Sequence, residues 1–386
     1  MAVGGTDMKW RQVAAVFCVL WSAPLLAGSS EDLESGEFNS SEICGECHEE
    51  IYSMWNRSMH SAALSDPIFE ASFLKAYWET RGEAQQVCLR CHAPVAAATG
   101  DLELHNPVSR EGVTCDFCHS VVSVDLGRQE SPFEVALDGV KRGPLADAES
   151  PVHGVVKSEL HESAEFCAGC HEYTNEKGVP ILTTYTEWKA SPQAKEGKTC
   201  QQCHMPLIPG ATVRSEFAPV DRESINLHNI SGMHSTEQVR KAATTKIVGL
   251  DRNESSLAQV EVEVVNSGSG HSIPTGLPTR KLTLEVVLYV DGKEVRRFER
   301  IYQKMLLDEN GDIITEDHRA MLGAHKVLDD NRLRPGERRR ERFHAVVPPK
   351  GVLEAEARLR YLYEPEVFSR ERISIEIASD TIGRKR

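Results

Sequence analysis

Cysteine and histidine are combined in one motif, Cys-x-x-Cys-His, which occurs five times between residues 44 and 204. In a helical turn, residues i, i+3 and i+4 lie on one face, so each motif presents two thiols and one imidazole on the same side. The thiols can form thioether bonds with a haem and the imidazole can bind its iron, so the copies predict five covalently attached c-type haems. The thiols belong to Cys44, Cys47, Cys88, Cys91, Cys115, Cys118, Cys167, Cys170, Cys200 and Cys203, and the imidazoles to His48, His92, His119, His171 and His204.

Other uses of paired cysteines explain this pattern less well. A zinc ribbon uses cysteine pairs as ligands, but it does not place a histidine directly after each pair. A disulfide framework is typical of short secreted chains, whereas this chain has 386 residues. A thiol–disulfide redox motif would account for one copy and not for five. The remaining cysteine, Cys18, lies in the leader and needs no partner.

Residues 1–29 have the layout of a secretory signal peptide. Lys9 and Arg11 precede an apolar stretch over residues 13–26, and small residues follow at 27–29. The apolar stretch is short and interrupted, which favours a cleaved leader over an uncleaved membrane anchor. Because haem is attached to this motif outside the cytoplasm, we expect an exported protein of the periplasm or the cell surface.

The formal net charge of −14 argues against nucleic acid as a partner, because basic residues recognise the phosphate backbone. An acidic surface suits docking to basic redox proteins, although it also serves ordinary solubility. The basic run at residues 332–342 is better explained as the solvated edge of a strand. The expected partners are therefore other redox proteins. Peripheral membrane association and assembly into a homo-oligomer or filament stay open.

The hydrophobic pattern changes near residue 238. Residues 30–237 contain every motif and few apolar runs, which predicts a mainly helical and irregular multihaem domain; within it, an Asp-Gly turn in residues 130–144 predicts a hairpin. Residues 238–386 alternate apolar and polar side chains, which predicts six to eight strands, with turns at Asp-Gly 291–292 and Asn-Gly 310–311. The predicted class is α+β, a multihaem domain followed by an all-β immunoglobulin-like sandwich.

Each haem iron has two axial positions, and the motif imidazole fills one of them. Ten of the fifteen histidines lie outside the motifs, enough to give every iron a second imidazole. His60 follows His48 by twelve residues on what the pattern predicts to be one helix, a rise of about 18 Å. Two imidazoles so placed cannot hold one iron from opposite faces. His60 is therefore predicted to bind a different haem from His48.

Longer phrases around the motifs resemble those of multihaem cytochromes of the c-554 family. They run from residue 38 to about residue 280 and include CLRCHAPVA, EGVTCDFCHS, TCQQCHMP, HNISGMH and NSGSGHSIPTGLPTRKL. The resemblance implies closely packed, largely bis-histidine haems and electron transfer. It favours His60, His153 and His228 as distal ligands. This chain has five motifs where the namesake has four, so the ligand pairing of the family is not transferred intact.

Two further histidines are candidate ligands. His234 follows Gly232-Met, and His271 lies in a Gly-His-x-x-Pro-Thr-Gly turn that either presents its imidazole to a haem or holds it against the backbone. His161 lies close before its own motif, and the haem at His92 has no obvious distal histidine. The remaining histidines are expected to be structural or exposed; they are His105, His318, His325 and His344.

Three functions are compatible with these features. An electron carrier passes electrons along its haems and needs only six-coordinate irons. A multihaem oxidoreductase acting on a small nitrogen or sulfur compound needs one open iron, for which the second haem, followed by Pro94, is the candidate. An assembly role for the β domain is compatible with the carrier. All five motifs end in histidine, unlike pentahaem nitrite reductases, whose catalytic haem has a lysine there. We therefore expect an electron carrier and assign no catalytic residue.

Overall fold

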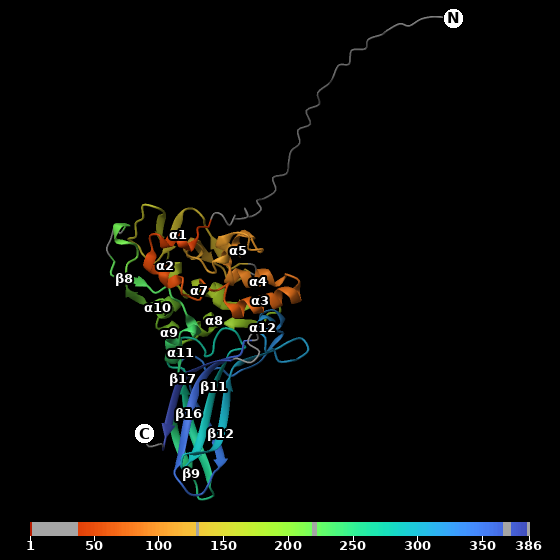
Figure 1. Cartoon of the computed structure of the whole chain (residues 1–386), viewed down its shortest axis with the longest axis vertical. Helices are drawn as coiled ribbons and strands as arrows, with labels where there is room; N and C mark the ends of the chain where they lie inside the picture. Colours follow the sequence, from red (N-terminus) through yellow and green to blue (C-terminus); the bar gives the residue numbers. More distant parts are fainter. Residues whose placement is uncertain (2–37, 129–130, 218–221, 366–371, 384–386) are drawn as a thin grey trace. The chain divides into compact units, whose positions relative to one another are not determined.

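The secondary structure changes from short helices to long antiparallel strands at Thr244 (Figure 1). The computed structural model describes Met1 and residues 38–128, 131–217, 222–365 and 372–383. The predicted signal peptide, residues 1–29, lies outside the described residues apart from Met1. The described residues from 38 onward belong to one compact unit, and the domain boundary at 237/238 stays a prediction.

Most helices of the N-terminal part are one or two turns long, too short to be stable alone, so contacts with the rest of the protein must hold them. Local caps help: Thr114 and Thr199 each accept a backbone hydrogen bond at the start of a helix. Within the described part of the chain, every helix is too short or too polar to span a lipid bilayer. The helices are α1 Ser41–Gly45, α2 Glu49–Trp55, α3 Pro67–Thr80, α4 Ala84–His92, α5 Pro94–Thr99, η2 Pro107–Arg110, α6 Cys115–Ser120, η3 Glu159–Glu162, α7 Ala164–His171, α8 Thr184–Lys189, α9 Pro192–Lys195, α10 Cys200–His204, η4 Ser215–Phe217, η5 Gly232–His234, α11 Thr236–Ala242 and α12 Asp317–Gly323.

Small two-stranded pairs lie between these helices. The hairpin predicted for residues 130–144 is wrong, because its two runs pair with different partners: β2 pairs antiparallel with β1, and β3 pairs parallel with β4. The physical reason lies in the third motif, since β3 supplies the Arg142 carbonyl to the His119 imidazole. The short strands are β1 Val121–Val124, β2 Phe133–Val135, β3 Val140–Gly143, β4 Gly154–Lys157, β5 Glu172–Thr174, β6 Pro180–Thr183, β7 Leu207–Pro209 and β8 Ser224–Asn226.

The C-terminal part contains two larger antiparallel sheets, a three-stranded sheet β15-β10-β9 and a four-stranded sheet β12-β11-β16-β17 (Figure 1). Alternate residues of both sheets, among them Val260, Leu284 and Leu359, are fully buried and share one hydrophobic core. The predicted period of two is therefore confirmed. The strands are β9 Thr244–Arg252, β10 Leu257–Val265, β11 Lys281–Val290, β12 Lys293–Tyr302, β13 Lys304–Leu307, β14 Lys326–Asp330, β15 Arg338–Val346, β16 Leu353–Tyr363 and β17 Ile373–Ile382, with β13 and β14 forming a separate pair.

Two local predictions for this part are confirmed. Asp291 and Gly292 both have positive φ and join β11 to β12 as a tight hairpin. The basic run enters β15, at one edge of the three-stranded sheet, and its exposed arginines pair with Glu261 and Glu263 on β10. These exposed arginines are therefore neutralised within the sheet. Arg332, at the start of the run, departs from the expectation of a solvated edge, because it precedes β15 and is buried.

The N-terminal part has little apolar core of its own. Its buried apolar residues form small clusters, for example Leu89 with Ala93 and Ala96. These clusters surround a cavity of about 1540 Å³. An interior that protein side chains leave open at this scale is suited to large prosthetic groups.

Candidate functional site

Four of the five motifs line the cavity with both cysteines and the histidine. In the second, third, fourth and fifth motifs, one short helix contains the two cysteines and the histidine, so their side chains share one face. The third is typical: α6 begins at Cys115, and the Thr114 hydroxyl caps it by accepting the Phe117 N–H at 3.0 Å. The motifs on the cavity wall are those of His48, His92, His119 and His171.

The protein holds three motif imidazoles by the same atom. His48 Nδ1 lies 2.7 Å from the Thr212 carbonyl. His92 Nδ1 lies 2.6 Å from the Ala63 carbonyl, and His119 Nδ1 lies 2.5 Å from the carbonyl of residue 142. A carbonyl only accepts hydrogen bonds, so each Nδ1 carries the proton and each Nε2 has a free lone pair. This is the tautomer that binds a metal through Nε2.

Three of the predicted distal histidines are held in the same way. Nδ1 of His153 donates to the Gly154 carbonyl at 3.0 Å, and Nδ1 of His271 donates to the Ser272 carbonyl at 3.0 Å. Nδ1 of His228 donates to the carbonyl of residue 226 at 2.7 Å. These side chains are therefore also prepared to bind a metal through Nε2.

His161 is held by the opposite nitrogen. Its Nε2 lies 2.9 Å from the Cys118 carbonyl and so carries the proton. Its ring stacks on His119 at 5.7 Å, but the nitrogen that would bind an iron is already used. The sequence could not decide the role of His161, and this hydrogen bond favours a structural one.

Two histidine pairs have the spacing that an iron between them would require. A metal–imidazole bond is about 2 Å long, so imidazoles on opposite faces of one metal have ring centres about 6 Å apart. The ring centres of His48 and His153 are 6.4 Å apart, and those of His204 and His271 are 6.3 Å apart. The first and fifth motifs each therefore face a second imidazole.

Motif histidines also act on the pKa values of two further histidines, His60 and His228. Burial lowers the pKa of His60 to about 4, and the nearby His171 lowers it further. Burial also lowers the pKa of His228 to about 4, with His119 as the next cause. Both imidazoles are thus neutral at pH 7, as metal ligands must be.

The continuous helix predicted from His48 to His60 is wrong. Helix α2 ends at Trp55, and His60 lies in the turns that follow. The turn that contains His60 is held against residue 113 and not against α2, because the His60 carbonyl accepts the Val113 N–H at 2.9 Å. His171 of the fourth motif acts on the pKa of His60, and His60 in turn acts on the pKa of His228. That His60 binds a different haem from His48 stays a prediction.

The second motif has a different neighbour. The His92 ring stacks on Phe69 at 3.6 Å with an interplanar angle of 9°. Among the described residues no imidazole ring is seen stacked on His92 in this way. His234 lies on η5, where burial lowers its pKa, and the Asp66 carboxylate acts on both His234 and His92. The structure thus brings these two histidines to a shared acidic neighbour without a ring contact between them.

Cysteines of different motifs contact one another. A hydrogen bond with Cys115 raises the pKa of Cys44, and the sulfurs of Cys167 and Cys200 are similarly paired. A third pair joins Cys91 to Cys170, and the Cys118 thiol acts on the pKa of both Cys167 and Cys170. The motifs are therefore adjacent in the order first, third, fourth, fifth, with the second joined to the fourth.

The residues present fit c-type haem. Arg280 lines the cavity, and its Nε has no hydrogen-bond partner among the described residues. A haem carries carboxylates that such a cation can bind, while the neutral imidazoles and paired thiols are the expected attachment groups. Phe69, Arg280 and the carbonyl acceptors were not found from the sequence, because only their positions in the fold give them these roles.

His318 has the structural role expected of it. It is buried, and its Nε2 lies 3.1 Å from Glu79 on α3 and 3.6 Å from Glu316. The contact joins α3 to α12 at the wall of the cavity.

Part of the chain is similar in sequence to a known cytochrome family, and its fold is similar to that of a solved cytochrome. The family model described as cytochrome c554 and c-prime matches residues 43–120. The penta-heme cytochrome c552 from Thermochromatium tepidum has a similar fold, with a TM-score of 0.68 and 22% identity over 90% of this chain and 99% of that chain. The CARDB domain of the PF1109 protein from Pyrococcus furiosus gives a TM-score of 0.17 and 14% identity over 37% of this chain and 84% of that chain. The comparison with curated proteins gives no match.

The fold of this chain is that of a penta-heme cytochrome, and the residues of the site fit c-type haem. The family model supports the resemblance predicted from the motif phrases, to multihaem cytochromes of the c-554 type, over residues 43–120.

Proposed function

We propose that this protein is an electron carrier that holds five covalent haems and passes electrons between extracytoplasmic redox partners. The observation that carries the proposal is the pairing of motif imidazoles with second imidazoles at the spacing of a shared iron, 6.4 Å for His48 and His153 and 6.3 Å for His204 and His271. An iron with two imidazoles has no position left for a substrate.

The proposed ligand sets follow from these contacts. The first haem takes His48 and His153, and the fifth takes His204 and His271. The third takes His119 and His228 and the fourth takes His171 and His60, on the basis of the electrostatic contacts. When bound, haem iron supplies reversible one-electron chemistry. The protein fixes the imidazole planes through the Nδ1 hydrogen bonds and excludes water by burial.

The motif contacts support a branched route for electrons. The first, third, fourth and fifth motifs follow one another, and the second joins at the fourth through Cys91 and Cys170. Electrons entering at either end of the row therefore pass the fourth haem. The electron donor and the electron acceptor are proposed to be redox proteins. The net charge of −14 disfavours nucleic acid as a partner.

Further parts of the proposal concern location and the β region. The leader supports export to the periplasm or the cell surface. The two sheets with one shared core support an immunoglobulin-like sandwich. Peripheral membrane association and a homo-oligomer or filament stay proposals of the same kind.

One observation favours a second candidate function. Phe69, and no imidazole among the described residues, stacks on His92. A second haem without a distal histidine would offer an open iron, where an oxidoreductase acting on a small nitrogen or sulfur compound would bind its substrate.

Intact mass and spectroscopy of the full protein test both candidates. We expect a mature chain beginning near residue 28 to 30 with five haem increments, low-spin electron paramagnetic resonance (EPR) signals at the four bis-histidine haems, and no carbon monoxide binding there. Fewer increments would contradict the proposal of five haems, and an unprocessed leader would contradict the predicted signal peptide. Carbon monoxide bound at the haem of His92, together with steady reduction of nitrite, hydroxylamine or tetrathionate, would favour the enzyme.

A further inference from the structure

His271 lies in a loop of the β part that has its own internal hydrogen bonds. The loop connects β10 to β11, and its histidine faces His204 of the fifth motif. Ser269 Oγ lies 2.9 Å from His271 Nδ1, and the buried Asn266 amide donates to the His271 carbonyl at 2.8 Å. These bonds set the ring within the loop. They do not set where the loop lies relative to the fifth motif.

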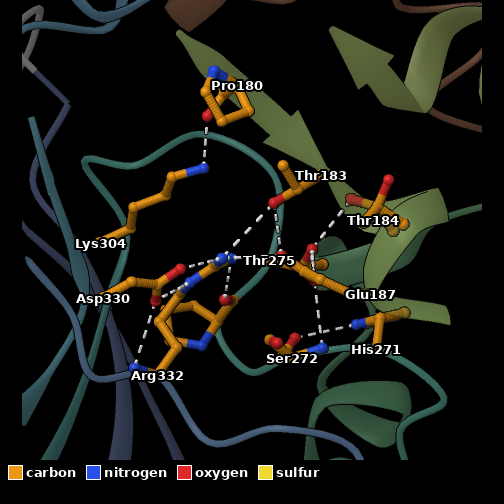
Figure 2. A network of polar contacts seen from close by, with 12 residues as sticks. Pro180, Thr183, Thr184, Glu187, His271, Ser272, Thr275, Lys304, Asp330 and Arg332 are labelled. Carbon is orange, nitrogen blue, oxygen red and sulfur yellow. Dashed lines mark hydrogen bonds and ion pairs between the residues drawn. The ribbon is translucent and has the colours of Figure 1, made fainter. Parts of the chain in front are cut away.

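A carboxylate from the other part of the chain reaches this loop. Glu187 on α8 is 9% exposed, and α8 lies between the fourth and fifth motifs in sequence. Its Oε2 accepts the Ser272 N–H at 3.1 Å and the Thr275 hydroxyl at 2.8 Å. One carboxylate thus binds both ends of the turn that directly follows His271, as Figure 2 shows.

A buried arginine completes the arrangement from the opposite side. Arg332 is 6% exposed and lies 2.7 Å from Glu187 Oε1. Its NH1 donates to the Pro274 carbonyl at 3.2 Å, and its Nε is 2.8 Å from Asp330. The turn after His271 is therefore held between Glu187 and Arg332 (Figure 2).

The location of this ion pair argues for a positioning role. Both charges are nearly removed from solvent, and an ion pair in such a place gives little net stability, although loss of one partner leaves an uncompensated charge. The ion pair instead fixes the position of the turn, because the Glu187 carboxylate also accepts hydrogen bonds from Thr183 and from Ser272 and Thr275 of the turn. Residues that hold a metal ligand without touching the metal orient that ligand in other proteins.

We propose that the Glu187–Arg332 pair positions His271 opposite His204, so that the sixth ligand of the fifth haem depends on contact between the β part and α8. The proposal rests on the proposed function, in which His271 is that ligand. It gives the β part a defined role in electron transfer: the coordination, and hence the potential, of one haem requires this contact.

Full-length holoprotein carrying Glu187→Gln or Arg332→Met tests the proposal, with His271→Ala as the reference. Gln keeps the size of Glu187 and removes its charge, and Met keeps the unbranched stem of Arg332 without its guanidinium group. The readouts are the haem count by intact mass, the high-spin signal in EPR and the midpoint potential of each haem. We expect one high-spin haem per molecule in His271→Ala. In Glu187→Gln and Arg332→Met we expect less than one high-spin haem per molecule. We also expect a shifted midpoint potential at the same haem.

Lys304→Met is the matched control. Lys304 is also buried at this contact, where its Nζ donates to the carbonyls of Pro180 at 2.5 Å and Ile181 at 3.3 Å. It makes no hydrogen bond to the His271 loop, and we expect its spectrum to match the wild type. Added imidazole should return the His271→Ala and Glu187→Gln haems to low spin, because it can fill the sixth position.

The outcomes separate the inference from the function beneath it. A wild-type spectrum for His271→Ala would reject the ligand assignment itself. A high-spin haem in His271→Ala with wild-type spectra for both Glu187→Gln and Arg332→Met would overturn the positioning role. The same would follow if Lys304→Met produced an equal high-spin fraction, since general loosening of the contact would then explain it. If Glu187→Gln fails to mature, Arg332→Met decides.

Discussion

The imidazoles of this chain differ in which ring nitrogen the backbone occupies. Nδ1 of His48, His119, His153 and His228 donates to a carbonyl and leaves Nε2 free, whereas His161 uses Nε2 toward the Cys118 carbonyl. All are histidines close to motifs, so residue type alone cannot rank them. The hydrogen bond can, because it selects the tautomer that is able to bind iron.

Replacement of His60 by alanine tests this reasoning at one residue. We expect His60→Ala to convert one haem to the high-spin form, and we expect that haem to be the fourth, because His171 is the motif imidazole that acts on His60. EPR of the variant, combined with single-motif knockouts, locates the affected haem.

His161→Ala is the control for that experiment. Burial lowers the pKa of His161 to about 4, as it does for His60, but the Nε2 of His161 is engaged by the Cys118 carbonyl. We expect its haems to stay low-spin. A lesion of His60→Ala at the first haem, or a high-spin haem in His161→Ala, would contradict the assignment.

At the scale of elements, short segments keep their places through close backbone contacts. The turn that carries His60 rests on residues 112–113, where the Val113 N–H donates to the His60 carbonyl. Gly112 has φ of 71°, and a Cβ there would lie 2.5 Å from the His60 carbonyl oxygen. Only glycine allows this approach.

Gly112→Ala should therefore disturb the fourth haem without touching any motif. The left-handed φ alone costs an alanine about 1–2 kcal/mol, and the backbone clash adds about 1–3 kcal/mol. We expect a lower midpoint of guanidinium denaturation and a high-spin fraction at the fourth haem.

Gly100→Ala separates the two causes. Gly100 has φ of 74°, but no atom lies within 4 Å of the position its Cβ would take. We expect this variant to lose only the conformational contribution and to keep every haem low-spin. Equal effects of the two substitutions would show that strain, and not the contact with His60, is responsible.

At the scale of the whole molecule, the two parts are built on different interiors. The β part has a continuous core to which both sheets contribute, and the packed Val239 of α11 belongs to it. The haem part has small apolar clusters around a cavity. The stability of the haem part is therefore expected to depend on its prosthetic groups. The stability of the β part is not.

A fragment from residue 236 to the C-terminus should fold without haem. The buried core of its two larger sheets is contained in the fragment, and its strands pair with one another. Circular dichroism should give a β spectrum with a cooperative thermal transition. A fragment that stays disordered would refute independent folding. It would also give more weight to the contact of Glu187 with Arg332 as a requirement for the fold.

The sequence by itself determined the chemistry of attachment and the secondary-structure class. Five Cys-x-x-Cys-His copies specify thioether and imidazole groups wherever the chain places them, and strict alternation specifies strands because a sheet has a period of two. The turn at residues 291–292 was predictable for the same local reason. Such features depend on neighbours along the chain.

Only the tertiary structure decided which histidine meets which motif. His60 approaches His171 after a helix that ends early, and His271 approaches His204 from the β part of the chain. The runs at residues 130–144 pair with other strands, and β3 places the Arg142 carbonyl at His119 of the third motif. These pairings join residues tens to more than a hundred positions apart, and their spacing along the chain carries no information about distance in space. Packing around the cavity sets them.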